Sequence, residues 1–247
     1  MSRAAILLVL ITTTLCAAAA PPAAPPRRGI SPPPIPDAPG VYMGRTVAQT
    51  MHYAGAPWLV RESRDREEDC TTLLEQLAVT PGMSLCDMGC GNGFYTIPLA
   101  KLTGPTGRVF AVDIQQPMLD MLSDNAKAAG VSNIEPLLGT YVDPGLAEKS
   151  VDLMLLVDVY HEMSHPEQML AAMRKALKPD GRLVLLEFRA EDPKVPIKPL
   201  HKMTKAQILK EYEANGFELV KAYDGLPWQH MMWFGPSQRE QPDGEEG

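Results

Sequence analysis

The sequence predicts an α/β protein with a doubly wound, mostly parallel sheet that is closed by an antiparallel hairpin. Apolar runs of roughly four to eight residues alternate with helical patterns of about ten to fifteen, the order that βαβ units produce. The runs are apolar almost throughout, as in strands covered by helices on both faces. The last two runs are joined by too few residues for a parallel crossover, so they must pair antiparallel.

The elements follow from the local pattern in chain order. Residues 57–79 carry mixed charge and then an apolar stripe, which predicts a helix that is either solvated along one edge or a lid over a pocket. The predicted strands are residues 84–88, 108–114, 133–138, 150–157, 182–188, 217–223 and 228–234. The predicted helices between them are residues 93–102, 117–129, 166–177 and 204–215. Gly130 directly follows the second of these helices and is expected to end it.

Both ends of the chain differ in composition from the body. Residues 1–20 have the pattern of a secretory signal peptide, with an uncleaved anchor or a start at Met43 or Met51 as alternatives. Residues 21–40 are so rich in proline that we expect an extended linker. Residues 236–247 are polar and are expected to fray. The protein is therefore predicted to be exported, to the periplasm or outside the cell.

The body itself divides into an N-terminal helical segment, residues 41–79, and a main domain, residues 80–235. The whole chain carries a formal net charge of −7, and residues 1–40 hold three arginines and one aspartate, so the remainder carries −9. Phosphates and anionic lipids attract clustered Lys and Arg. The acidic body therefore argues against a nucleic-acid partner and against a stable association with membrane, and we expect a small-molecule partner. The oligomeric state is not predicted.

The body has three cysteines, Cys70, Cys86 and Cys90. Their number and spacing fit neither a disulfide framework nor a metal site, so no metal is expected. Cys86 lies in an apolar run and is expected in the core.

A glycine-rich loop follows the first predicted strand of the main domain and precedes a helix. Gly89, Gly91 and Gly93 let the backbone turn tightly and approach a ligand, and the helix start adds free amide donors. The spacing differs from the G-x-G-x-x-G of dinucleotide sites. Asp87 precedes the loop, and its carboxylate would repel a pyrophosphate but attract a cationic or zwitterionic ligand.

Asp113 ends the next predicted strand, where an acid accepts hydrogen bonds from the two hydroxyls of a ribose. The alternative is that Asp113 caps the helix that begins near Pro117. Together with Asp87 it predicts an adenosine-containing ligand that carries positive charge and no phosphate bridge. S-adenosyl-L-methionine fits this description.

Four segments carry a resemblance: LCDMGCGNGFYT, VFAVDIQQPML, SVDLMLLVDVYHEMSHPEQML and LKPDGRLVLLEF. In this order they resemble the class I S-adenosylmethionine-dependent methyltransferases, in particular the ubiquinone-methyltransferase-like branch that acts on small molecules. The flanking segments WLVRESRDREED and IKPLHKMTKAQI resemble signal-bearing bacterial members. The resemblance implies a Rossmann-like sheet of seven strands and S-adenosyl-L-methionine as the methyl donor.

The resemblance also implies which residues bind this cofactor. The residues that would hold its methionine end are Asp87, Gly89, Cys90, Gly91, Asn92 and Gly93. Asp113 would bind the ribose, and Ile114 would pack on the adenine. The family often has an acid after the glycine that follows the third strand, whereas this chain has Gly139-Thr140. Either Thr140 or Asp143 would then meet the adenine amino group.

The candidate catalytic residues follow the fourth strand: Asp158, Tyr160 and His161. Methyl transfer from a sulfonium is an in-line displacement, so alignment and exclusion of water lower much of the barrier. Asp158 would lie near the methionyl group or the acceptor, and Tyr160 would line the acceptor pocket. His161 is the predicted base, because its unperturbed pKa is near neutral. The alternative is that His161 or His165 only orders the loop before Pro166.

Further polar and aromatic residues lie near the ends of the body. His201, Lys202 and His230 are expected at the surface rather than at the pocket mouth. Trp58 and Tyr53 would close over the acceptor if the N-terminal segment is a lid. Two functions are weighed: an active methyltransferase for a small acceptor, and an exported, non-catalytic S-adenosylmethionine-binding protein. The export signal motivates the second, because this cofactor is made in the cytosol.

Overall fold

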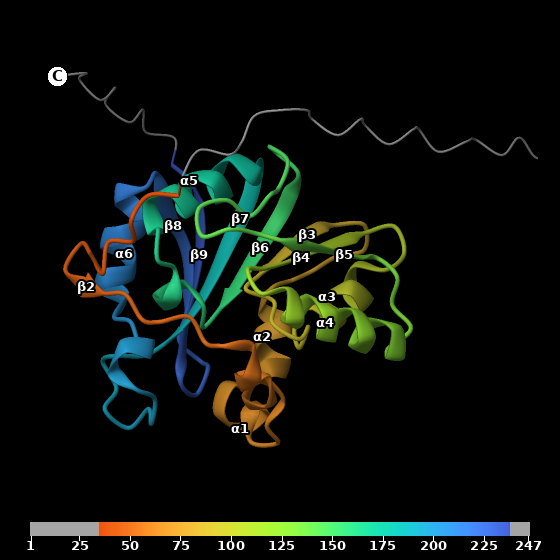
Figure 1. The fold of residues 1–247 in the computed structure, drawn as a ribbon, viewed down its shortest axis with the longest axis horizontal. Helices are drawn as coiled ribbons and strands as arrows, with labels where there is room; N and C mark the ends of the chain where they lie inside the picture. Colours follow the sequence, from red (N-terminus) through yellow and green to blue (C-terminus); the bar gives the residue numbers. More distant parts are fainter. Residues whose placement is uncertain (1–34, 238–247) are drawn as a thin grey trace, which may run out of the picture. The chain divides into compact units, whose positions relative to one another are not determined.

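A seven-stranded sheet forms the centre of the computed structural model, which describes residues 35–237 (Figure 1). Its strands lie in the order β5-β4-β3-β6-β7-β9-β8. Their bounds are β3 Ser84–Met88, β4 Arg108–Asp113, β5 Ile134–Leu138, β6 Val151–Val157, β7 Leu177–Phe188, β8 Phe217–Tyr223 and β9 Gln229–Pro236. The pairs from β5 to β7 are parallel, and β9 pairs antiparallel with both β7 and β8. The prediction of a doubly wound, Rossmann-like sheet with a C-terminal antiparallel hairpin is confirmed.

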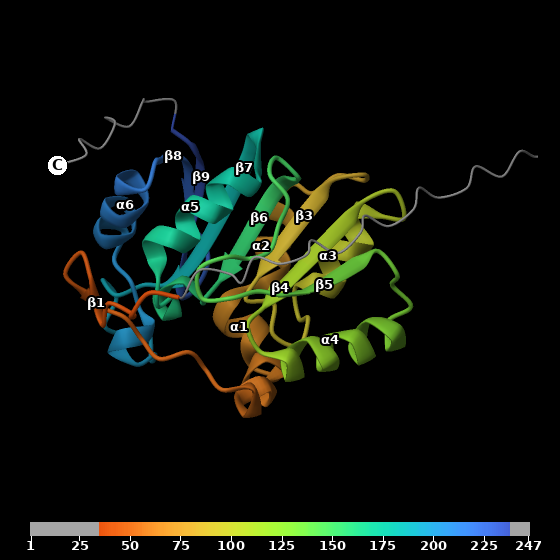
Figure 2. The ribbon, with the colours of Figure 1, turned by 45° about the horizontal axis from the view of Figure 1, so that its top comes forward.

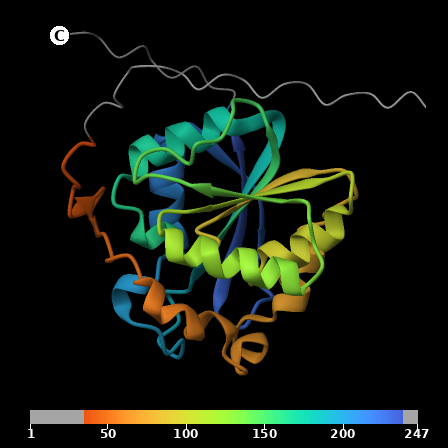
Figure 3. The same ribbon diagram turned by 45° about the vertical axis from the view of Figure 1, so that its right-hand side comes forward.

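Helices cover both faces of this sheet. Their bounds are α2 Cys70–Gln76, α3 Thr96–Thr103, α4 Gln116–Ala128, α5 Pro166–Ala176 and α6 Lys205–Ala214. Along β6, Leu153 and Leu155 pack in one cluster with α2 and α3, while Met154 and Leu156 pack in another with α5 and α6. This alternation is the two-residue period of a strand buried on both faces. Figures 2 and 3 show α4 and α5 on opposite sides of the sheet.

The strand order reverses between β3 and β6. The chain runs outward from β3 to β4 and β5, and then returns to the other side of β3 to form β6. Ligands of open α/β sheets bind in the crevice at the carboxyl ends of the strands near such a reversal. The loops after β3, β4, β5 and β6 meet there.

The prediction of one continuous helix over residues 57–79 is wrong. The structure divides this region into η1 Tyr53–Val60, α1 Arg64–Glu68 and α2 Cys70–Gln76. Asp69 separates α1 from α2 with a left-handed φ of 50°, and its carboxylate accepts a hydrogen bond from the Thr72 N–H. An aspartate inside a charged run gives no local sign that its backbone is left-handed, so the sequence pattern missed the break.

The other differences concern short elements and boundaries. The hairpin of β1 Val41–Tyr42 and β2 Arg45–Thr46 is too short to leave a periodic pattern and was not predicted, and the same holds for η2 Tyr160–Glu162 and η3 Pro199–His201. Strand β7 begins five residues before the predicted start. Gly130 follows α4 with a φ of 68°, as predicted.

Some predictions lie outside the described residues. These are the signal peptide, most of the proline-rich linker and most of the polar tail. Within residues 35–237, none of the helices combines the length and apolar character needed to span a bilayer. Cys70, Cys86 and Cys90 are buried and form no disulfide in this part of the chain, and Cys86 lies in the core as expected.

Candidate active site

A cavity of about 480 Å³ opens at the carboxyl ends of the parallel strands. Its wall includes residues from the loops after β3, β4, β5 and β6, from the segment before α2, and from the region between Pro196 and His201. Cavities that bind small molecules commonly have volumes of about 300–1,000 Å³. The cavity therefore has the size of a small-molecule site and lies at the reversal of strand order.

Gly89 and Gly91 form part of the cavity wall with bare backbone. Both have positive φ angles, 70° and 53°, which residues with side chains rarely adopt. A Cβ atom on Gly89 would collide with Val159, and one on Gly91 would lie 2.7 Å from Leu59. The loop is therefore a cradle in which the backbone faces the ligand.

The other predicted loop residues, Cys90, Asn92 and Gly93, lie outside the cavity wall. Cys90 packs in a buried cluster with Leu119 of α4. A Cβ atom on Gly93 would collide with Leu122 of the same helix. These residues seat the loop on α4.

Asp113 and Ile114 line the cavity at the end of β4, where the sequence predicts the ribose and adenine contacts. The two carboxylate oxygens of Asp113 accept hydrogen bonds from the Gln115 N–H at 2.9 Å and the Gly91 N–H at 3.0 Å. Burial raises the pKa of Asp113, and these two N–H groups act against that rise. Gln115, not Asp113, is the N-cap residue of α4. Each carboxylate oxygen keeps a lone pair for a ligand hydroxyl.

Asp87 lies beneath the glycine loop and outside the cavity wall, so its contact with the cofactor stays a prediction. Its carboxylate accepts a hydrogen bond of 2.5 Å from the Thr96 hydroxyl at the start of α3. Burial raises the pKa of Asp87 to about 6. A strand residue alternates between the two faces of the sheet, and this one faces the helix that follows the loop.

Asp158 is the carboxylate that faces the cavity after β6. One of its oxygens accepts a hydrogen bond of 2.7 Å from the Gln229 side chain, and the other is buried without a partner among residues 35–237. Burial and then the charges of Glu68 and Glu187 raise the pKa of Asp158 well above its ordinary value. Asp158 also has a positive φ of 51°. Backbone strain of this kind often occurs where a functional group must be held in one place.

Arg64 and Glu68 also line the cavity, although no sequence motif pointed to them. The Arg64 guanidinium donates to the Glu68 carboxylate at 2.8 Å and to the Leu59 carbonyl at 2.7 Å, and Arg61 donates to the second Glu68 oxygen. Arg64 is 5% exposed and Glu68 is 1% exposed. The opposite charges four residues apart were a usable signal, but that spacing is equally common on solvated helices.

His161 lies in the cavity wall and is only 2% exposed. Its Nδ1 atom is 2.6 Å from a carboxylate oxygen of Glu187, and its backbone N–H donates to the other oxygen at 3.0 Å. Burial is the largest influence and lowers the pKa of His161, but the charge and hydrogen bond of Glu187 together with the charge of Glu162 outweigh it, so the pKa is raised overall. The structure thus supports a fixed orientation for the predicted catalytic histidine.

His201 and Tyr160 are placed differently from the sequence expectations. His201 lines the cavity, with Nδ1 3.0 Å from Nε2 of His161, so the expectation of a surface position is wrong. Tyr160 is fully buried outside the cavity wall, and its hydroxyl donates to Glu211 of α6 at 2.8 Å. The one-turn helix η2 directs neighbouring residues to different sides of the chain, which corrects the acceptor-pocket role predicted for Tyr160.

Further candidates divide between the cavity and its surroundings. Thr140 and Trp58 line the cavity, and the Thr140 hydroxyl accepts a hydrogen bond of 2.9 Å from the Asp143 N–H. The candidates outside the wall are Tyr53, Gly139, Asp143, His165, Lys202 and His230. His230 is 4% exposed, so the expectation of a surface position for it is wrong. His165 is the N-cap residue of α5, which agrees with the structural role considered for it.

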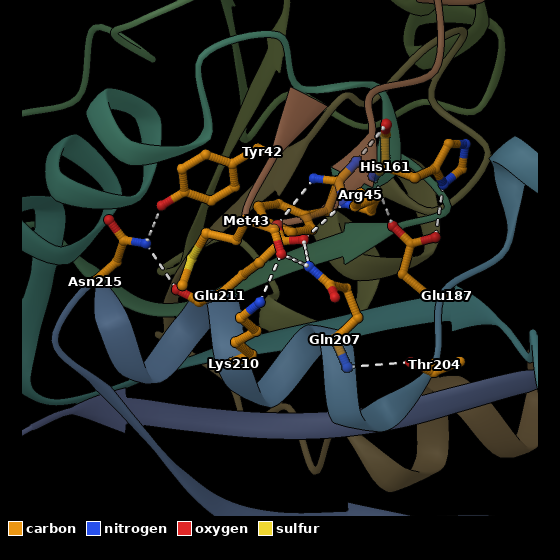
Figure 4. Close-up of polar contacts among 11 residues, drawn as sticks. Tyr42, Met43, Arg45, His161, Glu187, Thr204, Gln207, Lys210, Glu211 and Asn215 are labelled. Carbon is orange, nitrogen blue, oxygen red and sulfur yellow. Dashed lines mark hydrogen bonds and ion pairs between the residues drawn. The ribbon is translucent and has the colours of Figure 1, made fainter. Parts of the chain in front are cut away.

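The chain between β2 and η1 crosses this region and holds it in place (Figure 4). The Arg45 side chain and the Ala48 N–H both donate to the backbone carbonyl of His161 at 3.0 Å. The Met51 N–H donates to one carboxylate oxygen of Glu162, also at 3.0 Å. We call residues 45–51 the strap, because they tie the η2 turn to the rest of the site.

The residues present fit S-adenosyl-L-methionine. The cradle of Gly89 and Gly91 has no space for side chains but leaves the backbone exposed to a ligand. Asp113 has lone pairs for two hydroxyls. The unpartnered oxygen of Asp158 suits an ammonium group, because a buried polar atom needs a hydrogen-bond partner.

Comparisons with known proteins identify the family of the chain. A family model described as "Methyltransferase domain" matches residues 79–232, more than half of the chain. The chain is 33% identical over 163 residues to the ubiquinone/menaquinone biosynthesis C-methyltransferase UbiE of Burkholderia orbicola, covering 66% of this chain and 56% of that protein. It is 31% identical over 113 residues to the nocamycin O-methyltransferase of Saccharothrix syringae, covering 46% and 40%. The chain thus spans about half the length of these curated relatives.

A solved structure shows the same fold. The SAM-dependent methyltransferase from Aquifex aeolicus superposes with a TM-score of 0.70 at 22% identity, covering 75% of this chain and 98% of that chain. Its sheet architecture and the family match both support the assignment made from the motifs. The chain belongs to the class I S-adenosylmethionine-dependent methyltransferases.

Proposed function

We propose that this protein transfers the methyl group of S-adenosyl-L-methionine to a small-molecule acceptor by in-line displacement. The observation that carries the proposal is that the residues expected to bind the cofactor and the oriented His161 line the same cavity. Gly89, Gly91 and Asp113 would position the donor, and Asp158 would hold its ammonium group. The bound cofactor supplies an activated methyl group on sulfur.

The rest of the wall supports a partly apolar acceptor. Its apolar side chains include Met51, Met163, Met169, Phe188, Pro196 and Ile197. Such a wall excludes water and fixes the acceptor against the donor, and alignment of this kind supplies much of the rate of a displacement. The names of the two relatives place the methyl group on carbon in one and on oxygen in the other.

His161 is the residue that we propose activates the acceptor. Nδ1 is held by Glu187, so Nε2, which lies 3.0 Å from Nδ1 of His201 in the cavity wall, is the ring nitrogen that would meet the acceptor. Direct acceptance of a proton at Nε2 is the simplest mode for an acceptor that attacks from an O–H or N–H group. No feature of the described residues favours the alternative expectation of a non-catalytic binding protein.

Calorimetry and label transfer test this function. The purified protein should bind S-adenosyl-L-methionine and its demethylated product, and it should pass a labelled methyl group to an acceptor in a panel of small hydroxyl- and amine-bearing compounds. Failure to bind either ligand at millimolar concentration contradicts the proposal. Binding with no transfer to any compound of the panel contradicts the catalytic part.

We also propose that the protein is exported, which rests on the signal-peptide pattern of residues 1–20. Fusing residues 1–40 to alkaline phosphatase, which is active only after export, should give an active reporter. Deleting residues 4–15 from the same fusion should abolish the activity. An inactive full fusion, expressed at the same level, would show that the segment does not direct export.

A further inference from the structure

Three side chains with metal-binding atoms meet in the cavity wall: His161, Glu162 and His201. Nε2 of His161 lies 3.0 Å from Nδ1 of His201. Oε1 of Glu162 lies 3.8 Å from each of these two nitrogen atoms. The three atoms therefore form a nearly regular triangle.

The size of this triangle matches a first-row metal ion. The point in the plane of the three atoms that is equidistant from them lies about 2.1 Å from each. Zinc binds His nitrogen and carboxylate oxygen at about 2.0–2.2 Å. An ion could therefore be held with little movement of the three side chains.

The surroundings hold two of the three groups in the required orientation. Nδ1 of His161 faces the fully buried Glu187 at 2.6 Å, the carboxylate–histidine contact that usually supports a metal-ligating histidine. The second carboxylate oxygen of Glu162 accepts a hydrogen bond from the Met51 N–H of the strap. Both contacts leave the atoms that face the triangle available.

A hydrogen bond between the two imidazoles is the competing explanation. It accounts for the 3.0 Å contact, with the Nδ1–H of His201 donating to Nε2 of His161. It gives no role to Oε1 of Glu162, which lies equally far from both nitrogen atoms and beyond hydrogen-bond range of either. A central ion accounts for all three separations.

We propose that His161, Glu162 and His201 form a binding site for a divalent metal ion of the zinc class. Two histidines and one carboxylate are the ligand set of catalytic zinc and of non-haem iron sites, which keep a further position open. Magnesium and calcium prefer oxygen ligands throughout and fit less well. The expectation that the protein binds no metal rested on the number and spacing of its cysteines. The proposed ligands instead come from η2 and η3, which are far apart in the sequence and meet only in the fold.

The open position would take an oxygen atom of the acceptor, an assignment that rests on the proposed function. Coordination would lower the pKa of an acceptor hydroxyl, so that its proton passes to water. The oxygen lone pair then forms the bond to the methyl carbon. The electron pair of the breaking S–C bond stays on sulfur, which leaves as a neutral thioether. With the ion bound, coordination of the acceptor oxygen would replace direct proton acceptance by His161, because its Nε2 atom would then bind the metal.

Metal titration of the untagged full chain tests the site. After removal of metal with a chelator, Zn²⁺ is titrated in competition with a chromophoric indicator, and Co²⁺ is followed by its visible absorption. We expect one ion per chain, and at least tenfold weaker binding in His201→Asn and in Glu162→Gln. His52→Asn is the matched control, because His52 lies outside the cavity wall. Absence of stoichiometric binding, or wild-type affinity in His201→Asn, overturns the proposal.

Two further measurements separate this site from the donor site. His201→Asn should bind S-adenosyl-L-methionine as tightly as the wild type and melt at the same temperature when metal-free. A wild type that binds Zn²⁺ but no cofactor would contradict the proposed function alone. With an identified acceptor, metal-free protein should lose methyl transfer and regain it with Zn²⁺. Full activity of the metal-free protein would overturn the role of the ion in acceptor activation.

Discussion

The carboxylates of Asp113, Asp158 and Asp87 differ in their hydrogen-bond partners and in their position relative to the cavity, so we expect them to have different roles. Asp113 faces the cavity and accepts two backbone hydrogen bonds, Asp158 has one unpartnered oxygen, and Asp87 is bonded to Thr96 beneath the loop. A carboxylate in the wall can meet a ligand, whereas a buried one supports the loop. The two tasks lead to different predictions for substitutions.

Asp113→Ala should weaken the binding of S-adenosyl-L-methionine by at least about 100-fold, because hydrogen bonds to a charged group contribute about 1.5–3 kcal/mol each and two are lost. Isothermal calorimetry measures the change. Asp120→Ala is the control, because Asp120 is an exposed residue of α4 outside the cavity wall. An unchanged affinity in Asp113→Ala would show that the ribose assignment is incorrect.

Asp87→Asn should change how stability depends on pH. The folded-state pKa of Asp87, about 6, lies above the ordinary value of 3.8, so the folded state holds its proton more tightly. Stability is therefore lost as pH rises from about 4 to about 6, by on the order of 3 kcal/mol in total. Asp87→Asn removes this loss, so its free energy of unfolding relative to wild type should rise between pH 4 and pH 7.

Urea unfolding at the two pH values measures that difference. Asp120→Asn should keep the pH dependence of the wild type, since its carboxylate is exposed. A difference between Asp87→Asn and wild type that stays the same at pH 4 and pH 7 would show that burial does not raise this pKa.

At the scale of elements, the strap depends on one buried ion pair (Figure 4). The Arg45 guanidinium donates to both carboxylate oxygens of Glu211 on α6, at 2.7 and 2.9 Å. The Tyr160 hydroxyl donates to the same carboxylate. These contacts link the N-terminal hairpin, the η2 turn and α6, so the position of His161 depends on segments far apart in the sequence.

Arg45→Met should cost about 3–5 kcal/mol of stability, because it leaves the fully buried Glu211 charge unpaired. Arg108→Met is the control, since Arg108 is 60% exposed and 3.7 Å from Glu135, and should cost less than about 1 kcal/mol. Urea unfolding of both variants gives the comparison. Equal losses would mean that the buried pair does not hold the strap.

A lid is one of the two alternatives that the sequence leaves open for residues 57–79, which contain part of η1 and all of α1. Trp58, Leu59 and Arg64 line the cavity, so a bound cofactor should slow amide hydrogen exchange across residues 53–69. Mass spectrometry with and without S-adenosyl-L-methionine measures this protection. Protection of the glycine loop without any protection of residues 53–69 would rule out the lid.

At the scale of the whole molecule, helices cover both faces of the sheet. Substitutions at its centre should therefore destabilise the protein far more than substitutions at its edge. Leu155 of β6 is fully buried between the sheet and the α2–α3 layer, so Leu155→Ala should cost about 2–5 kcal/mol. Val220 of the edge strand β8 is 53% exposed, and Val220→Ala should cost less than about 0.5 kcal/mol. Thermal and urea unfolding test both. Similar losses would contradict this distribution of the core.

Much of the fold could be predicted because its signals are local. Strands β3 and β8 have the predicted bounds, and the positive φ of Gly130 ends α4 as expected. Alternation, helical spacing and glycine positions are properties of a few neighbouring residues, so they can be detected without knowing the fold. The break at Asp69 could not, because its left-handed backbone is stabilised by a contact and is not marked by the residue type.

The parallel sheet, the glycine loop and the place of Asp113 at the end of a strand could be predicted, because strand, helix and loop positions follow from the pattern along the chain. The position of Asp158 in the cavity wall was also expected, but the burial of Asp87 beneath the loop and of Arg64 and Glu68 in the wall became visible only in the folded chain. The tertiary structure also decided that His201 meets His161 across 40 positions of sequence. Such contacts could not be predicted from the sequence, because the direction of a side chain and the identity of its partners depend on packing between distant segments. A local sequence pattern carries no information about that packing.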